Sequence, residues 1–238
     1  MDTGDIVNIA NFQKMISSVN GYGGVYKPSN SDIEASKLQN KFDAVNAELD
    51  TRDTDKAGED AAGTDRENLF KPLGSLVTAT VNYYDSTGAE DNKIADAKGF
   101  QRKIQGARAK AITPTAPGAT PPKTISVSQL SYENKVQHLD GLTEVYKTDS
   151  NYNPNETKFT TASLETYSVQ LKAANANAIN TVTTAANSEK AFKTGLYADK
   201  TGMCDLAGLV KKYVKALFGA SSPEFKQISG LVFRKKKI

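Results

Sequence analysis

Apolar residues recur every three or four positions along most of the chain, the spacing that places them on one face of an α-helix. Before residue 110 this spacing predicts four helices, over about 5–20, from residue 32 onward, over 72–85 and from residue 91 onward. The second helix runs into a charged region. The sequence does not determine where this helix ends, because glycine is unfavourable inside a helix and both Gly58 and Gly63 lie in the charged region.

Apolar spacing of the same kind returns after residue 125. It predicts helices over about 130–145, 156–197 and 203–218, followed by an apolar segment over 225–233. The long helix is rich in Ala and Thr, and small side chains at helical spacing imply the close approach of a neighbouring helix. The Gly-Leu-Val-Phe sequence that ends at Phe233 fits either a short strand or an apolar strap, and elsewhere we expect almost no strand.

Half of the eight prolines fall within one short stretch that is also rich in Thr, Ala and Gly. They are Pro114, Pro117, Pro121 and Pro122. Proline fixes φ and lacks a backbone donor, so such a cluster favours an extended linker. We therefore predict a first helical segment over 1–110, a linker over 111–125 and a second helical segment over 126–238.

The two segments resemble each other at three places, which occur in the same order. The first place pairs Tyr26, Pro28, Ile33 and Leu38 with Tyr152, Pro154, Phe159 and Leu164, each 126 positions later. The second pairs Leu73, Leu76, Val77, Val81 and Tyr84 with Leu206, Leu209, Val210, Val214 and Leu217, each 133 positions later. The seven extra residues are close to two helical turns, so we expect them in a longer helix. The predicted fold is all-α, a duplicated helical bundle of two similar halves with about four helices each and long amphipathic helices.

The third place lies near the end of each segment. It pairs Phe100, Ile104 and Gly106 with Phe225, Ile228 and Gly230. A glycine after an apolar residue at the end of a helix is typical of a helix cap. Because the element occurs in both segments, it is also a candidate docking element.

Two runs of the sequence carry a resemblance to known proteins. They are Phe-Lys-Pro-Leu-Gly-Ser-Leu-Val-Thr, residues 70–78, and Phe-Gly-Ala-Ser-Ser-Pro-Glu-Phe-Lys-Gln-Ile-Ser-Gly, residues 218–230. These runs resemble a group of uncharacterised bacterial helical proteins over most of the chain. The resemblance implies a bacterial, stand-alone protein and implies no activity.

The charge of the chain is unevenly distributed, although its 238 residues carry a formal net charge of only +3. Residues 1–110 contain 14 basic and 17 acidic side chains, whereas residues 111–238 contain 16 and 10. One interpretation is drift between two duplicated halves, increased by the basic run over 234–237. The other is complementarity between an acidic and a basic half, within the chain or head to tail between copies.

The residues that catalytic and metal sites need are scarce. One histidine, His138, and one cysteine, Cys204, cannot form a tetrahedral zinc site, and no Gly-x-Ser-x-Gly turn accompanies the histidine. Cys204 also has no partner for an intramolecular disulfide. The acidic run from Asp53 lacks the later carboxylates of a calcium loop, and the glycines at 58 and 63 lack the lysine of a phosphate loop. We predict no catalytic, cofactor-binding or metal-binding residue, and no cofactor.

Basic side chains form the remaining candidate surface. They are Lys211, Lys212, Lys215, Arg234, Lys235, Lys236 and Lys237. Clustered lysine and arginine bind phosphates or acidic partners. The alternative is a solvated helix face, because Tyr213 and Val214 fit the apolar stripe of the same helix.

These observations favour a non-enzymatic structural or protein-interaction protein that self-assembles. The alternative is a nucleic-acid-associated protein that uses the basic second half, and the third is an enzyme or ligand binder without a recognisable site. The expected partner is a protein or a second copy. The sequence has no secretory leader and no run near 18 apolar residues, so we expect a cytoplasmic protein without a transmembrane segment.

Overall fold

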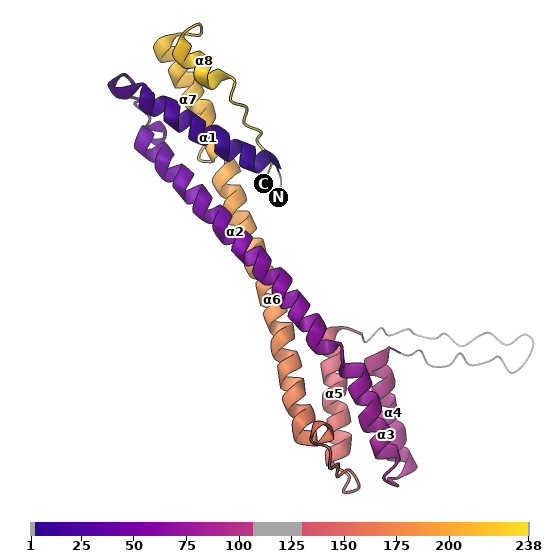
Figure 1. Ribbon diagram of the computed structural model, residues 1–238. Helices are drawn as coiled ribbons and strands as arrows, with labels where there is room; N and C mark the ends of the chain where they lie inside the picture. Colours follow the sequence, from indigo (N-terminus) through magenta and orange to yellow (C-terminus); the bar gives the residue numbers. More distant parts are fainter. Residues whose placement is uncertain (1–2, 107–129, 238) are drawn as a thin grey trace, which may run out of the picture. The chain divides into compact units, whose positions relative to one another are not determined.

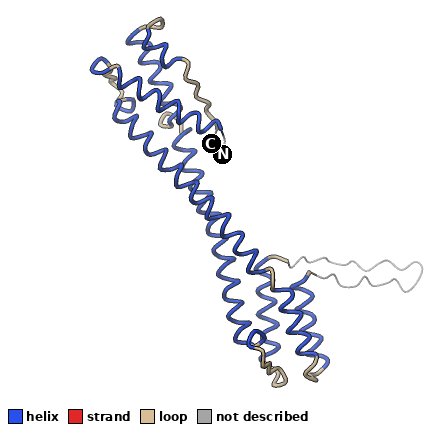
Figure 2. Tube along the Cα trace, in the orientation of Figure 1, coloured by secondary structure: helices blue, strands red, loops and turns tan. Residues whose placement is uncertain are grey.

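The computed structural model describes residues 3–106 and 130–237, and all regular secondary structure in these residues is helical (Figures 1 and 2). The α-helices are α1 (Thr3–Gly21), α2 (Ala35–Phe70), α3 (Leu73–Asp85), α4 (Asp91–Gln105), α5 (Tyr132–Lys147), α6 (Thr161–Tyr197), α7 (Met203–Phe218) and α8 (Pro223–Ser229). Short 3-10 turns are η1 (Gly23–Val25), η2 (Ser31–Ile33) and η3 (Thr157–Phe159). The predicted all-α class is confirmed, and the predicted linker over 111–125 lies outside the described residues.

Helix α2 does not end at either glycine. It continues through Gly58 and Gly63 to Phe70, and a Cβ at either glycine would have no heavy atom within 4 Å. Each glycine costs about 1 kcal/mol relative to alanine in a helix interior. Tertiary packing of the helix outweighs that cost, as is usual for helices of folded proteins.

The segment after α8 is a strap and contains no strand. Residues 230–237 have no regular secondary structure, and Leu231 and Phe233 pack against the buried core. We call residues 230–237 the strap. Figure 2 shows it as a loop that follows α1.

The chain forms two compact units, the first built from two separate stretches of the chain and the second from a single stretch. Unit 1 contains Met1–Glu59 and Thr181–Ile238, and unit 2 contains Asp60–Asn180. Helices α2 and α6 each contribute residues to both units. Each unit therefore draws on both predicted segments, and the repeat boundaries read from the sequence stay a prediction.

Each unit has its own apolar core. Fully buried side chains of unit 1 include Phe12, Met15, Leu38, Phe192, Met203 and Val210. Those of unit 2 include Tyr84, Leu139, Leu142, Tyr146, Leu164 and Leu171. At Gly195 of α6 a Cβ would lie 3.0 Å from Cγ2 of Val45 and still closer to the carboxylate of Glu48, so glycine allows these side chains of α2 to approach.

Helix α2 buries part of an arginine in each unit. In unit 1 the guanidinium of Arg52 lies 4.4 Å from the ring centroid of Phe192, and its Nε is 3.7 Å from a carboxylate oxygen of Glu189. In unit 2 the guanidinium of Arg66 lies 4.3 Å from the ring centroid of Tyr132. Arg52 also pairs with the adjacent Asp53 at 2.6 Å, so its contacts with Phe192 and Glu189 add a link between α2 and α6 but do not alone compensate its charge.

Only one of the seven extra residues of the second segment lies in its long helix. Helix α6 has 37 residues and α2 has 36. The connection over 198–202 is longer than the connection over 71–72, and α7 has 16 residues where α3 has 13. The expectation of a longer second helix was wrong, because the length is shared between a loop and the next helix. One predicted pair also differs in environment, since Tyr84 is buried and Leu217 is 38% exposed.

The repeated Phe, Ile and Gly element lies at a helix end in both places. Ile104 and Ile228 are buried, whereas the two phenylalanines pack at the edge of each core. Gly106 has φ 71° and forms a left-handed cap of α4, as the sequence predicts. Gly230 is the C-cap of α8, as the sequence predicts, but its φ of −77° is right-handed, so the two caps differ in backbone conformation.

Replacing Gly58 by alanine should stabilise the protein, because the site is helical and open. We expect Gly58→Ala to raise the free energy of unfolding by about 0.5–1 kcal/mol in denaturant titrations followed by circular dichroism. Gly106→Ala is the opposite control, since its φ is positive and the new Cβ would lie 2.6 Å from Cδ2 of Leu130. It should lower the same free energy by about 1 kcal/mol or more. Equal effects of the two substitutions would contradict this account of α2.

Candidate functional site

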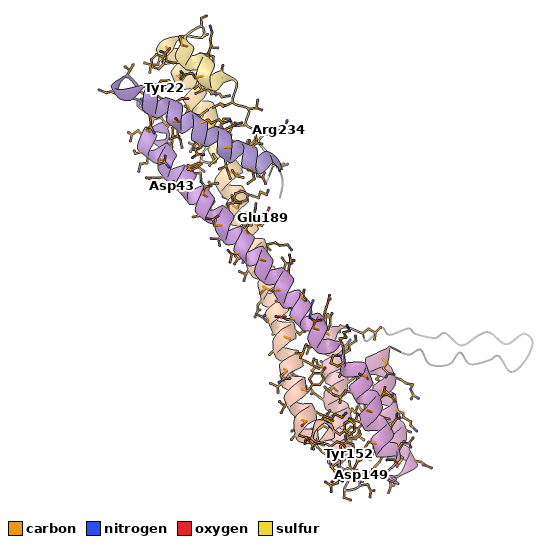
Figure 3. The ribbon with its side chains drawn as sticks, in the orientation of Figure 1. Tyr22, Asp43, Asp149, Tyr152, Glu189 and Arg234 are labelled. Carbon is orange, nitrogen blue, oxygen red and sulfur yellow. The ribbon has the colours of Figure 1, made fainter. Side chains whose placement is uncertain are left out.

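The backbone of the strap is bound by two asparagines of α1. Nδ2 of Asn11 donates to the carbonyl oxygen of Val232 at 2.8 Å. Nδ2 of Asn8 donates to the carbonyl oxygen of Arg234 at 3.0 Å, and the N–H of Arg234 donates back to Oδ1 of Asn8 at 2.9 Å. The later residue of α1 binds the earlier residue of the strap, so the helix and the strap run antiparallel (Figure 1). Figure 3 shows Arg234 beside the first half of α1.

Helix α7 holds the opposite side of the strap. Nζ of Lys211 donates to the carbonyl oxygens of Ser229, at 3.1 Å, and of Leu231. The same ammonium lies 5.6 Å from the ring centroid of Phe233, whose ring meets Phe12 of α1 edge to face at 6.4 Å. Burial lowers the pKa of Lys211. The strap is therefore anchored by apolar side chains and by donors that bind its main chain.

A fully buried carboxylate lies beneath the end of the strap. Asp5 of α1 accepts hydrogen bonds from Lys193 and Tyr197 of α6 and from Nζ of Lys236 of the strap, the last at 3.0 Å. Burial by itself raises the pKa of Asp5, but these three donors outweigh it and hold the pKa below its usual value. Burial and the charge of Asp5 raise the pKa of Tyr197. The network therefore contains an ionised carboxylate and a neutral tyrosine at neutral pH.

A second ion pair closes the edge of the same surface. Nζ of Lys235 lies 2.7 Å from Oδ2 of Asp205 in α7 and 3.4 Å from Oδ1 of Asp199. The carboxylate of Asp205 also accepts the N–H of Lys200 at 2.8 Å. The hydrogen bond from Lys235 lowers the pKa of Asp205, and the same bond raises the pKa of Lys235. This pair is partly exposed, so solvent screens it and it contributes little to stability.

We call this surface, made by Asp5, Asn8, Asn11, Asp205 and Lys211, the strap groove. It brings together some of the basic residues singled out in the sequence. Lys211, Lys235 and Lys236 bind groups of the same chain, and Arg234 is held through its backbone. Lys215 lies 6.0 Å from the ring centroid of Phe225, while Lys212 and Lys237 are exposed.

Sequence reasoning missed the groups that receive the strap. Asp5, Asn8 and Asn11 follow one another at three-residue spacing, so they share one face of α1. That polar stripe beside an apolar one is the signal that could have identified them. Asp5 belongs to the first predicted segment and Lys193 and Lys236 to the second, so these ion pairs join the two segments, whereas Lys235 pairs with acids of its own segment.

Unit 2 contains a different buried carboxylate. Asp149 is 6% exposed and accepts the hydroxyl of Tyr84 at 2.6 Å and the N–H of Asn151 at 3.0 Å. The hydrogen bond from Tyr84 contributes most to lowering the pKa of Asp149. Tyr146 and Tyr152 stack beside it with ring centroids 3.9 Å apart, and Figure 3 shows Asp149 close to Tyr152. Every group named here binds within unit 2, so the cluster fixes the connection after α5.

Outside these clusters the described residues include a buried thiol in unit 1 and a surface hollow in unit 2. Burial, followed by the charge of Asp205, raises the pKa of Cys204 to about 11, so its thiol is protonated at neutral pH and weakly nucleophilic. A hollow of about 630 Å³ in unit 2 lies over Phe70 and Tyr132 and is bordered by Lys135. Among the described residues, no three His, Cys, Asp or Glu side chains are grouped closely enough to hold a metal ion.

Comparison with family models, with curated protein sequences and with solved structures gave no match to this chain. In residues 3–106 and 130–237, none of the helices has the length and apolar character needed to cross a membrane.

Replacing Asp5 by asparagine should destabilise unit 1, because it leaves the ammonium groups of Lys193 and Lys236 without their shared carboxylate. We expect Asp5→Asn to lower the free energy of unfolding by about 3 kcal/mol, the usual effect of breaking a buried ion pair from one side. Denaturant titration measures the change. Asp43→Asn is the matched control, since Asp43 is exposed (Figure 3) and should change stability by less than about 0.5 kcal/mol. A similar effect of both substitutions would contradict the role given to Asp5.

The same carboxylate should make stability depend on acid. Its folded pKa lies below the ordinary value of 3.8, so its contribution is fully present above that value and is lost as the pH falls through both pKa values. We expect Tm to fall between about pH 5 and pH 2, and to fall less steeply in Asp5→Asn. Differential scanning calorimetry across this range measures both slopes. Parallel pH profiles for the two proteins would show that Asp5 does not carry the effect.

Proposed function

We propose that this chain is a non-enzymatic protein-interaction protein whose binding surface is the strap groove. The observation that carries the proposal is the way in which Asn8, Asn11 and Lys211 bind the strap. All three side chains bond to main-chain groups of the strap. Main-chain hydrogen bonds to an extended segment are the means by which proteins dock peptides with affinity, while side-chain pockets add specificity.

The groove also distinguishes side chains. Leu231 and Phe233 pack against the core, whereas Val232 between them is 60% exposed. Further along, Lys235 and Lys236 meet carboxylates. The ligand that the groove fits is therefore an extended segment with an apolar residue, an aromatic residue two positions later, and basic residues after that.

We also propose that the two segments arose by duplication. The hydroxyl of Tyr26 donates to the carbonyl oxygen of Ile33 at 2.7 Å, and the hydroxyl of Tyr152 donates to that of Phe159 at 2.7 Å. Turns η2 and η3 also begin 126 positions apart, as do α2 and α6. A shared tertiary hydrogen bond is more specific support than matching apolar residues, because it depends on the path of the backbone.

The first helix of each segment supports the same proposal. Five buried positions of α1 recur in α5 at a spacing of 127, namely Ile9, Phe12, Met15, Ile16 and Val19 with Val136, Leu139, Leu142, Thr143 and Tyr146. Unit 1 combines α1 with α7 and α8, and unit 2 combines α5 with α3 and α4. Each unit thus takes its first helix from one segment and its last helices from the other. A single ancestral segment would have completed its core with a second copy, which favours self-association as the original activity.

The nucleic-acid alternative is less well supported. Its candidate residues include Lys211, Lys235 and Lys236, whose ammonium groups already bind carbonyl or carboxylate groups of the same chain. Binding of a phosphate would have to replace these bonds. The described surface therefore favours a role for these lysines in holding the strap.

A peptide that copies the strap should bind the groove when the natural strap is weakened. We expect the full-length double variant Phe233→Ala, Lys236→Ala to bind a fluorescent peptide of residues 229–237 saturably in anisotropy titrations, and more tightly than the unaltered chain does. Adding Asn11→Ala removes one hydrogen bond, worth about 1 kcal/mol, and should weaken binding about fivefold. A peptide of the same composition with Phe and the second Lys exchanged is the control. Equal binding of both peptides would contradict a specific groove.

A further inference from the structure

We infer that the strap groove also accepts the strap of a second copy of this chain, so that two copies exchange straps. This inference rests on the proposed function and names its partner. Exchange of an identical element is a low-cost route to a dimer, because the contacts within one chain can be formed again between two chains.

The bonds that hold the strap can be transferred between copies. From Val232 to Lys236 the hydrogen bonds described above reach Asn8, Asn11 and Asp5 of α1 and Asp205 of α7. Helix α8, to which the strap is joined, supplies none of these groups. A strap from another copy would therefore meet the same donors and acceptors in the same order.

Charge favours this occupant over other extended segments. Three carboxylates, those of Asp5, Asp199 and Asp205, lie where the basic part of the strap enters the groove. The strap carries the basic run over 234–237. Asp5 is fully buried and needs a cationic partner, so an acidic or neutral segment would leave it with Lys193 and Tyr197 alone among these three donors.

Gly230 provides a joint at which the strap can change direction. Its φ of −77° lies in an ordinary region, and no heavy atom lies within 4 Å of the position of a Cβ. Helix α8 before it is fixed independently, by the side chain of Ser222 at its first turn and by the buried Ile228. The strap can therefore leave its groove without unpacking α8.

A strap docked in its own chain and a strap docked in a second copy form the same bonds. The protein concentration therefore determines which of the two arrangements predominates. A short tether holds the strap near its own groove at an effective concentration on the order of millimolar. Exchange should therefore be a minor state in dilute solution and become substantial as the protein concentration approaches about 1 mM. Reciprocal exchange closes a two-fold dimer, so it should stop at two copies.

The test places one cysteine in the groove of one chain and one in the strap of another. Both full-length chains carry Cys204→Ala, the first also carries Lys14→Cys, and the second also carries Val232→Cys. Lys14 is exposed and lies one turn from Asn11 on the same face of α1, so this change leaves the hydrogen bond of Asn11 in place. The two chains are mixed over a concentration series up to about 1 mM and treated briefly with a short bismaleimide. A second mixture replaces Val232→Cys by Val25→Cys, which is similarly exposed, at 58% against 60%, and is not part of the strap. One chain with both Lys14→Cys and Val232→Cys reports docking within a chain.

We expect the double-cysteine chain to form an internal link. We also expect the first mixture to yield at least fivefold more cross-linked heterodimer than the Val25→Cys mixture, with a yield that rises with concentration. Mass spectrometry identifies both products. An internal link with equal heterodimer yields in the two mixtures at every concentration would overturn exchange and leave the groove in place. Absence of the internal link would overturn the groove itself, and the proposed function with it.

Discussion

The fully buried carboxylate of Asp5 is the constraint on which unit 1 depends. An ionised carboxylate in an apolar interior is stable only when it is paired and hydrogen-bonded, because desolvation of an unpaired charge costs several kcal/mol. Its partners come from α6 and from the strap, some 190 and 230 positions away along the chain. Satisfying this one group therefore fixes three segments relative to one another, and the asparagines one and two turns along α1 extend the same alignment to the backbone of the strap.

Unit 2 also pairs a buried carboxylate, with partners that lie 65 and 56 positions away along the chain. Its buried carboxylate, Asp149, also accepts a tyrosine hydroxyl, from Tyr84, and has a lysine nearby, with Nζ of Lys93 3.4 Å away. Both units thus combine a tyrosine donor with a lysine at a buried acid. The difference is that Asp149 stabilises a connection within its unit, whereas Asp5 holds a segment that has no secondary structure of its own. Asp149 thus stabilises a core, whereas Asp5 holds the strap against one.

Much of the fold could be predicted from periodicity, because each long helix exposes one face and buries another. The bounds of α3, α4 and α7 follow closely from Pro72, Asp91 and the apolar stripe before Phe218. Periodicity could not decide whether α2 continues through its glycines, since packing supplies the compensating free energy. Nor could it identify the strap groove, because the lysines of the strap look solvated until the distant acids that bind them are placed. The spacing along α1 predicts that Asp5, Asn8 and Asn11 share one face of the helix, but it does not reveal their partners.

The two ion pairs of the strap should respond differently to salt, because their carboxylates differ in exposure. Lys235 and Asp205 are partly exposed, with side chains 43% and 26% accessible, so ions of the solvent screen their attraction. The pair of Lys236 and Asp5 differs in that Asp5 is wholly buried, although Lys236 is 37% accessible, so solvent ions screen this attraction less. Raising the ionic strength should therefore weaken the contact of Lys235 more than that of Lys236. The main-chain bonds from the asparagines involve no ionised group, so salt leaves them in place when the exposed ion pair of the strap is screened.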